Sequence, residues 1–356
     1  MRLVVVAVVA CVLLAGCEGI SRITNSTYQD GVRCMTQAIS GDGRWVAYST
    51  MGDPSGIRTD QQTRLHDRRT GRSVQLYGLG SNVTQGASVD ADGSDIVFRI
   101  AVRTSSSSED RVYVYKRATG QRTRISPVGE SAFATAISGD GKKVAYAVEQ
   151  KGIYLYDAIA KTRKRVSAVP ASSTDYEAPR LSTSGRIMTY VKYTGPTTSI
   201  QLVVRDNQTG NEWSLLSGSE RADAGAVVSG DGRWVVYTKA HPGLLGGRSQ
   251  VYVWDRTTHT SRRITSVAAG TAVGDATISA DGSTLAYLQY QSGQGDVNHL
   301  VRVDRASGAT SVAVTGNHFL HGPAIDADGH AIAFCTDATN LVAHSPQAPN
   351  VYVATH

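Results

Sequence analysis

Residues 39–48 read Ile39-Ser-Gly-Asp-Gly-Arg-Trp-Val-Ala-Tyr48, and related phrases recur along the whole 356-residue chain. Seven copies follow one another at intervals of 44 to 50 residues. The other six begin at Val89, Ile137, Leu181, Val228, Ile278 and Ile325. All copies keep Asp-Gly except the one at 181–190, which has Ser-Gly. A period of this length indicates one repeated supersecondary unit, and this decides the architecture.

Each unit contains four short segments in which apolar and polar residues alternate, as they do in half-buried strands. The first segment leads into Asp-Gly and the second, of the Val-Ala-Tyr type, leaves it. In the third unit the remaining two are Gly152-Ile-Tyr-Leu-Tyr156 and Arg163-Lys-Arg-Val-Ser167. We expect Asp-Gly to form a type I′ hairpin turn, with positive φ at both residues. No segment shows a sustained helical period, so the chain is predicted to be all-β.

Four strands in each of seven units predict a seven-bladed β-propeller of four-stranded antiparallel blades. The last unit lacks a fourth strand, because Asn350-Val-Tyr-Val-Ala354 matches a third strand. Ile20-Ser-Arg-Ile-Thr24 matches a fourth strand, so the N-terminal strand is expected to close the last blade and remove two exposed edges. The predicted organisation is a signal peptide at 1–16, a lipidated linker at 17–19 and the propeller at 20–356.

The N-terminal residues predict export. Leu3 to Leu14 form an apolar run that is too short to span a bilayer and fits a secretory signal peptide. The following Leu14-Ala-Gly-Cys17 resembles the lipobox of bacterial lipoproteins, in which the Cys is diacylated and becomes the N-terminus. The resemblance implies a lipid anchor, such as palmitate, at Cys17 and a place on the periplasmic or extracellular face of a membrane. The alternative is an ordinary cleaved signal with a chance Cys.

Charge and cysteine usage narrow the choices further. The formal net charge is +6 and is spread along the chain, so we expect no nucleic-acid partner. Cys34 and Cys335 are placed at the same end of neighbouring blades and predict a disulfide that staples the ring. Two free thiols are the alternative. The fourth strands are basic, which protects an outer edge from pairing. An anionic partner is the second interpretation.

The phrase Ser-x-Asp-Gly and Val-Ala-Tyr, followed by Val-Tyr-Val and a Gly-containing turn, resembles the WD40-like PD40 repeat. That repeat builds the propeller domain of the TolB translocation protein and of many bacterial surface and periplasmic proteins. Here Gly or Ala stands where the repeat commonly has Pro. The resemblance covers residues 20–356 and implies a TolB-like propeller of the cell envelope.

Few motifs point to chemistry. Asp90-Ala-Asp92-Gly93 and Asp326-Ala-Asp328-Gly329 look like fragments of calcium loops, but no downstream Glu stands at the required spacing. Turn chemistry is therefore the favoured interpretation of these Asp residues. The chain has no zinc-binding His spacing and no Gly-x-Ser-x-Gly elbow. We expect no metal, no cofactor and no attached hydrolase half.

Propellers bind ligands where the loops that lead into the innermost strands converge on the channel. Polar residues stand about seven places before several Asp-Gly turns, where the repeats differ most. The candidate channel-mouth residues are Gln85, Glu177, Arg180, Asp223, Asp275, His318 and His321. The alternative is a solvated entrance without a ligand.

The function predicted from these features is that of a lipid-anchored, monomeric and non-enzymatic module. It would bind a protein or polymer of the cell envelope. The alternative is a propeller enzyme that acts on an envelope polysaccharide or peptide through channel-mouth carboxylates, one as acid and one as base.

Overall fold

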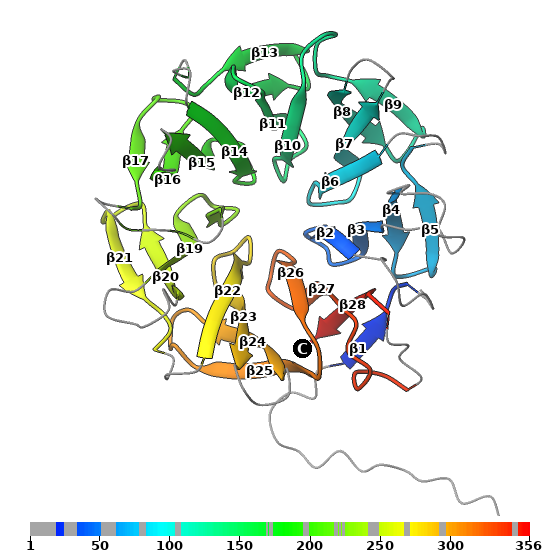
Figure 1. Cartoon of the computed structure of the whole chain (residues 1–356), viewed down its shortest axis with the longest axis vertical. Helices are drawn as coiled ribbons and strands as arrows, with labels where there is room; N and C mark the ends of the chain where they lie inside the picture. Colours follow the sequence, from blue (N-terminus) through cyan, green and yellow to red (C-terminus); the bar gives the residue numbers. More distant parts are fainter. Residues whose placement is uncertain are drawn as a thin grey trace, which may run out of the picture.

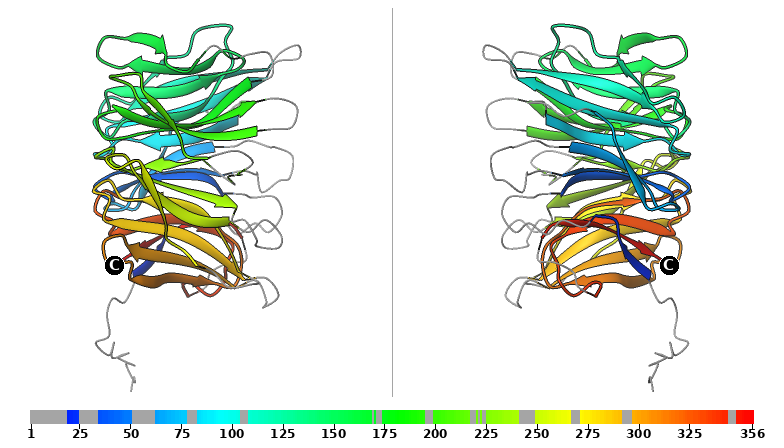
Figure 2. Two further views of the ribbon diagram at one scale, coloured as in Figure 1. Left: turned by 90° about the vertical axis from the view of Figure 1, so that its left-hand side faces the viewer. Right: turned by 90° about the vertical axis from the view of Figure 1, so that its right-hand side faces the viewer.

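The computed structural model describes residues 19–24, 34–50, 62–77, 83–103, 108–168, 170, 174–194, 199–216, 220, 222, 225–240, 249–266, 271–291, 297–343 and 348–356. Within these ranges 28 strands form seven antiparallel sheets of four strands each. The sheets stand as blades around a central channel (Figure 1), and the molecule is a disc when seen from the side (Figure 2). No helix in the described part is long and apolar enough to cross a membrane.

The strands of each blade follow one another in chain order from the channel outward, except that β1 is the outermost strand of blade 7. Blades 1 to 4 contain β2 (Cys34–Ile39), β3 (Trp45–Thr50), β4 (Gln62–Asp67), β5 (Arg72–Gln75); β6 (Val83–Val89), β7 (Asp95–Arg103), β8 (Ser108–Lys116), β9 (Gln121–Arg124); β10 (Ala132–Ile137), β11 (Lys143–Val148), β12 (Gly152–Asp157), β13 (Thr162–Arg165); and β14 (Thr174–Leu181), β15 (Ile187–Thr194), β16 (Ser199–Asp206), β17 (Glu212–Ser214). Blades 5 to 7 contain β18 (Val227–Val228), β19 (Trp234–Ala240), β20 (Ser249–Asp255), β21 (Thr260–Arg263); β22 (Thr271–Ile278), β23 (Thr284–Gln291), β24 (Asn298–Asp304), β25 (Thr310–Gly316); and β26 (Leu320–Ile325), β27 (Ala331–Thr336), β28 (Asn350–Thr355), β1 (Gly19–Arg22).

The two ends of the chain share blade 7. Strand β1 pairs antiparallel with β28, so that Gly19 faces Thr355 and Arg22 faces Tyr352. The predicted seven-bladed propeller and its closure by the N-terminal strand are confirmed. The fourth strand of the third unit was predicted one to two residues too late, since β13 covers 162–165 and not 163–167.

The Asp-Gly turns differ from the predicted type I′ geometry. In blade 1, Gly43 has a φ of 68°, whereas no Asp of the described Asp-Gly turns has positive φ. The Trp45 amide donates to Ser40 Oγ at 2.9 Å, and the Arg44 amide donates to Asp42 Oδ1 at 3.0 Å. The loop therefore has four residues between the paired Ser40 and Trp45, and its side chains hold the backbone turn.

Backbone hydrogen bonds join the seven turns into a closed belt around the channel. In each blade the amide of the turn Asp, or of the residue before it, donates to a carbonyl in the next blade. The bonds are Asp42 N to Ala91 O, Ala91 N to Gly139 O, Asp140 N to Thr183 O, Thr183 N to Gly230 O, Asp231 N to Ala280 O, Asp281 N to Ala327 O and Ala327 N to Gly41 O, at 2.9–3.3 Å. The last bond returns to the first blade.

The belt explains why Pro is absent at three of the positions that precede the Asp or Ser of the turn. Ala91, Thr183 and Ala327 donate their amides to it, and Pro has no amide hydrogen to donate. Gly230 is also held by space, because a Cβ there would lie 2.5 Å from Thr183 Oγ1 and 2.7 Å from Ala280 Cβ. The contact between blades therefore excludes Pro at Ala91, Thr183 and Ala327 and a larger residue at Gly230.

Neighbouring blades are also clamped by tryptophan. The ring of Trp45 lies between the guanidinium groups of Arg44 and Arg117, which are 4.6 and 4.2 Å from the ring centroid. Its Cδ1 atom would lie 2.2 Å from a Cβ on Gly93, the turn glycine of blade 2. The same arrangement joins blades 5 and 6 through Trp234, Arg233, Arg305 and Gly282.

The predicted disulfide and the predicted lipid anchor lie at the limits of the described residues. Cys335 on β27 is disulfide-bonded and buried. Strand β2 begins at Cys34, but the side chain of Cys34 lies outside the described residues, so its pairing with Cys335 stays a prediction. Residues 1–18, with the predicted signal peptide and Cys17, also lie outside them.

Candidate functional site

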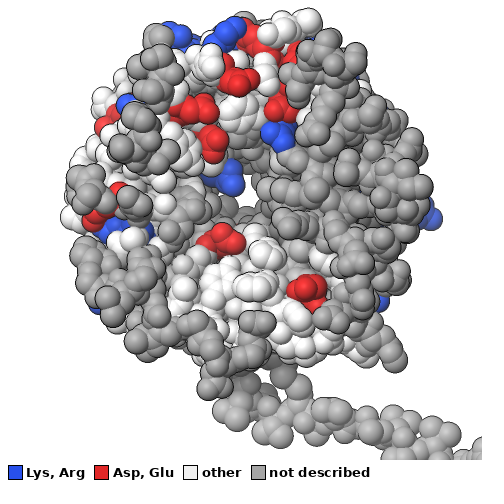
Figure 3. All heavy atoms as spheres, viewed as in Figure 1, with Lys and Arg blue, Asp and Glu red and all other residues white. Residues whose placement is uncertain are grey.

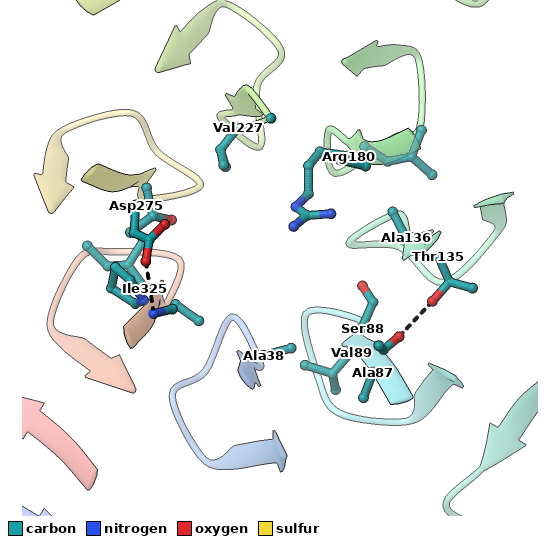
Figure 4. A pocket seen from close by; sticks show the side chains of 18 of the residues that line it. Ala38, Ala87, Ser88, Val89, Thr135, Ala136, Arg180, Val227, Asp275 and Ile325 are labelled. Atoms are coloured by element: carbon teal, nitrogen blue, oxygen red, sulfur yellow. Dashed lines mark hydrogen bonds between the residues drawn. The ribbon is translucent and has the colours of Figure 1, made fainter. Parts of the chain in front are cut away.

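The innermost strands enclose a cavity of about 690 Å³ on the axis of the ring. Its wall includes one residue from each blade, four places before the Asp or Ser of the turn: Ala38, Ser88, Ala136, Arg180, Val227, Thr277 and Ala324. Arg180 is the one charged member of this ring, and its side chain extends into the lumen (Figure 4). Within this ring a single long cation therefore projects among short, mostly apolar side chains. The other arginine of the cavity lining, Arg99, lies 3.5 Å from the carboxylate of Asp110.

The guanidinium of Arg180 has almost no protein partner. Its Nη1 donates to the carbonyl of Pro179 at 2.9 Å, and no carboxylate of the described residues lies within ion-pair distance. The side chain is open to the water of the channel, yet protein surrounds it, and this loss of solvation lowers the pKa of Arg180 from its ordinary value. An arginine stays protonated even so. Among the described residues most of its five N–H donors have no acceptor, so they can bind an anion.

A bulge in the innermost strands shapes the mouth of the channel. The pairing of β14 with β15 slips between Glu177 and Arg180, and the inserted Ala178 has a φ of 48°. The equivalent residues of blades 2, 6 and 7 also have positive φ: Gly86, Asp275 and Gly322. Because a bulge turns the strand, it directs the neighbouring side chains into the lumen. Asp275 occupies a position where two other blades need glycine.

Two carboxylates on the cavity wall each lie beside a tyrosine. Burial raises the pKa of Tyr193, and the charge of Glu177 beside it adds to this shift. Burial likewise raises the pKa of Tyr290, with a contribution from Asp275. The Oδ2 atom of Asp275 accepts the amide of Gly322 at 3.3 Å (Figure 4). Glu177 belongs to blade 4 and Asp275 to blade 6, so they approach the cavity from different sides.

The remaining predicted residues are not on the cavity wall or are not described. His318 Nδ1 lies 3.9 Å from Asp337 Oδ2, and His321 stacks on Phe319. Both histidines lie at the start of blade 7, outside the lining of the cavity. The side chain of Gln85 and the whole of Asp223 lie outside the described residues. The structure thus brings Glu177, Arg180 and Asp275 together around one cavity.

Sequence reasoning missed the tyrosines. Tyr193 and Tyr290 stand three residues after the repeated aromatic of their units, Tyr190 and Tyr287. At this position only blades 4 and 6 carry Tyr, and these are the blades with Glu177 and Asp275. A comparison of the seven copies at this one position would have found both tyrosines.

In the space-filling view, a basic and an acidic group flank the central opening (Figure 3).

The described residues offer no metal centre. Among them, no three His, Cys, Asp or Glu side chains lie close enough to hold a metal ion. The turn aspartates that resemble calcium loops accept amides of their own turns, as Asp92 Oδ1 does from Ser94 at 2.8 Å and Asp328 Oδ1 does from His330 at 3.0 Å.

No protein-family model and no curated protein matches the chain. Among solved structures, an oligogalacturonate lyase from Vibrio parahaemolyticus has a TM-score of 0.67 at 11% identity, covering 94% of this chain and 93% of the lyase. A putative TolB from Agrobacterium tumefaciens has a TM-score of 0.51 at 16% identity, covering 83% and 98%. The lyase and the TolB protein share the propeller fold with this chain. A structure of prolyl endopeptidases has a TM-score of 0.62 at 11% identity, covering 85% of this chain and 46% of the other.

These likenesses correct one prediction. The chain was expected not to be an enzyme, and the fold gives no support for that exclusion, because a lyase and prolyl endopeptidases have similar propellers. The exclusion had been based on missing hydrolase motifs. Propellers place reactive groups at the channel through residues from several blades, which leaves no contiguous motif. The prediction of a non-enzymatic protein is therefore wrong.

Proposed function

We propose that this chain is a lipid-anchored propeller of the cell envelope that binds a carboxylate-bearing ligand at its channel, with Arg180 as the anchoring cation. The observation that carries this proposal is the guanidinium that projects into the cavity with a single backbone acceptor. Arginine presents a planar fork that matches a carboxylate with two parallel hydrogen bonds. An enclosed lumen strengthens such a pair relative to bulk water.

The size and composition of the cavity also support a ligand of this kind. A volume of about 690 Å³ lies within the range of small-ligand sites, which are mostly apolar with a few placed polar groups. The neighbour with a TM-score of 0.67 is an oligogalacturonate lyase, and oligogalacturonate carries a carboxylate on each sugar. Glu177 and Asp275 repel any carboxylate placed next to them, so we expect a carboxylate of the ligand to be bound at Arg180.

Replacement of Arg180 by glutamine is expected to weaken binding of oligogalacturonate at least tenfold, because a charge-assisted pair contributes about 1.5–3 kcal/mol. Isothermal titration calorimetry at low salt measures this, since salt screens the pair. The control is Lys164→Gln on the exposed outer strand β13, which is expected to leave the affinity unchanged. Equal affinities of wild type and Arg180→Gln would refute the proposal.

The anchor is tested separately. Replacement of Cys17 by serine removes the only acceptor for the acyl chains, and the protein is expected to move from the membrane fraction to the soluble fraction. Cell fractionation combined with labelled palmitate follows both the location and the modification. Cys11→Ser, which changes a cysteine within the apolar run of the signal, is the matched control. Retention of Cys17→Ser in the membrane fraction contradicts the lipid anchor.

A second candidate function is cleavage of the bound ligand at the same site. It is favoured by the two carboxylates that line the cavity, Glu177 and Asp275, each of which lies beside a tyrosine, Tyr193 and Tyr290 respectively. Such pairs can exchange protons with a substrate. Time courses of new chain ends from oligogalacturonate, with wild type and with Asp275→Asn, test it. Product formation that Asp275→Asn abolishes supports cleavage, and the lack of product with wild type contradicts it.

A further inference from the structure

Phe319 stands out on the surface beside the channel. Its side chain is 52% exposed, and it is the only aromatic residue among the exposed large hydrophobic residues of the described part of the chain. It precedes the fully buried Leu320 at the start of β26. Single exposed apolar residues are common on protein surfaces, so the exposure of Phe319 gains meaning only from the groups around it.

The backbone around Phe319 is fixed by side-chain hydrogen bonds. The amide of Asn317 donates to Asn340 Oδ1 at 3.1 Å, and its Nδ2 donates to Thr339 Oγ1 at 2.9 Å. In return, the amide of Thr339 donates to Asn317 Oδ1 at 2.9 Å. The loop that carries Phe319 is thus tied to the segment after β27. The ring is exposed by a defined conformation of the chain.

Two further rings set the orientation of Phe319. His321 stacks on it, with centroids 6.1 Å apart and an interplanar angle of 25°, and Tyr290 packs at 6.5 Å with a tilt of 48°. The Tyr290 hydroxyl donates to the carbonyl of Leu320 at 3.5 Å. These contacts form an aromatic platform of Tyr290, Phe319 and His321, of which Phe319 offers the largest apolar exposure.

A hydrogen-bond acceptor lies next to this platform. Burial raises the pKa of the Tyr290 hydroxyl and the nearby charge of Asp275 adds to this shift. The Asp275 carboxylate also accepts the amide of Gly322, which follows His321. One amide uses one of about four lone-pair positions of a carboxylate, so Asp275 retains capacity for other donors. Tyr290 is thus in contact with Phe319 and lies beside Asp275, and it connects the apolar platform to the acceptor.

We infer that the aromatic platform and Asp275 form a stacking subsite for a pyranose ring, so that the ligand is an acidic saccharide chain. A pyranose has an apolar face of C–H groups, which packs on Phe319, and an edge of hydroxyls, which donate to Asp275. A peptide anchor instead fills a pocket with its side chain. Phe319 is not part of the cavity wall and offers a flat surface. This inference rests on the proposed function, because Arg180 supplies the charge selection.

The test uses the full-length, detergent-solubilised protein and three probes. They are oligogalacturonate, the same oligomer with its carboxyls reduced to alcohols, and an oligoglutamate peptide of equal charge. Phe319→Ala is expected to weaken binding of both saccharides about tenfold, because stacking is independent of charge. Phe319→Tyr is expected to retain binding. The control Val128→Ala removes another exposed apolar side chain, 84% exposed, and is expected to change nothing.

The outcomes separate this subsite from the proposed function. Arg180→Gln is expected to weaken only the charged saccharide. If Phe319→Ala binds both saccharides as wild type does, or if oligoglutamate binds more tightly than either saccharide, the stacking subsite is overturned. The proposed function still stands in those cases if anion binding depends on Arg180. If the neutral saccharide depends on Phe319 while the charged one ignores Arg180, the proposed function falls and the subsite stands.

Discussion

Replacement of Asp90 and Asp326 together by serine is expected to stabilise the propeller at pH 7.5 and to leave its stability unchanged at pH 4. Both residues occupy the first position of the repeated turn, where the other five blades have Ser: Ser40, Ser138, Ser182, Ser229 and Ser279. In blade 3, Ser138 Oγ donates to Asp140 Oδ1 at 2.7 Å and accepts the amide of Lys143 at 2.9 Å. A carboxylate can accept but cannot donate.

The environment of Asp90 shows the consequence. It is 3% exposed, its Oδ2 accepts Ser94 Oγ at 2.8 Å, and within the described part of the chain its buried Oδ1 has no hydrogen-bond partner. Burial raises the pKa of Asp90 to about 6, and the charges of Asp92 and Asp95 add to this. The pKa of Asp92 is lowered, first by its hydrogen bond from Ser94. Of the two neighbouring carboxyls Asp90 and Asp92, Asp90 is therefore the one that takes up a proton.

Asp326 repeats this situation in the blade that closes the ring. It is 5% exposed, and its Oδ1 is likewise without a partner among the described residues. Burial raises the pKa of Asp326, and the charge of Asp328 acts in the same direction. Arg68 of blade 1 attracts the charge of Asp326. The pKa of Arg68 itself is lowered, mainly by burial. This attraction opposes the upward shift of Asp326 without removing it.

The sign of the pH dependence follows from these shifts. A carboxyl with a raised pKa binds its proton more tightly in the folded state, so the stability that it contributes is complete below the unfolded pKa of about 3.8. That stability is lost as the pH rises through the folded pKa of about 6. A difference of about two units corresponds to about 3 kcal/mol for Asp90. Asp326 adds to it in the same direction.

Denaturant unfolding at pH 4 and pH 7.5 measures the effect. The double variant is expected to have a higher midpoint than wild type only at pH 7.5, with the same slope. The reciprocal variant Ser138→Asp is expected to introduce the same pH dependence into blade 3. A double variant that is less stable than wild type at pH 7.5 would show that the two carboxyls have partners worth more than the cost of their burial.

Truncation of Trp45 to alanine is expected to lower the free energy of unfolding by about 3–5 kcal/mol. Trp45 is 8% exposed and fills the interface between blades 1 and 2, where Arg44 and Arg117 cover its ring. The variant leaves a cavity that two guanidinium groups cannot fill. Thermal and denaturant unfolding measure the loss. A change below about 1 kcal/mol would show that the blades are held together without the clamp.

Gly93 supplies a double-mutant cycle for this contact. Gly93→Ala alone places a Cβ 2.2 Å from Trp45 Cδ1 and forces alanine to adopt a φ of 70°, so it is expected to be strongly destabilising. In the Trp45→Ala background the clash is gone and only the backbone strain remains. The loss of stability in the double variant is therefore expected to be smaller than the sum of the losses in the two single variants. Strict additivity would mean that Gly93 is required for its φ alone.

The fold was predictable because the repeated phrase combines strong turn residues with alternating strands. Ile20 to Thr24 and Asn350 to Ala354 even revealed the shared last blade. The turn type was not predictable from Asp-Gly alone, because Ser40 Oγ lengthens the loop through its bond with the Trp45 amide. The phrase Asp-Gly is compatible with both geometries, and the residue two places earlier decides between them.

The candidate site was predictable only in part. Counting back from the turns identified Glu177, Arg180 and Asp275, since equivalent positions in a ring of blades face one channel. The bulge that directs them inward carries no sequence signature when Ala178 or Asp275 occupies the position that favours glycine. Phe319 was missed because it precedes a strand and has no counterpart in the other repeats. Contacts between blades could not be predicted from a pattern that repeats within each blade.

The belt of backbone hydrogen bonds separates the construction of the channel from its recognition properties. Each bond joins main-chain atoms of adjacent turns, so the bore of the ring is set by peptide geometry and not by the side chains that line it. Among the lining residues four places earlier, Ser88 also bonds the next blade, because its Oγ accepts the amide of Ile137 at 3.2 Å. We expect the other six to be exchangeable one at a time without a change in the spacing of the blades. A library restricted to those six would explore binding at constant architecture.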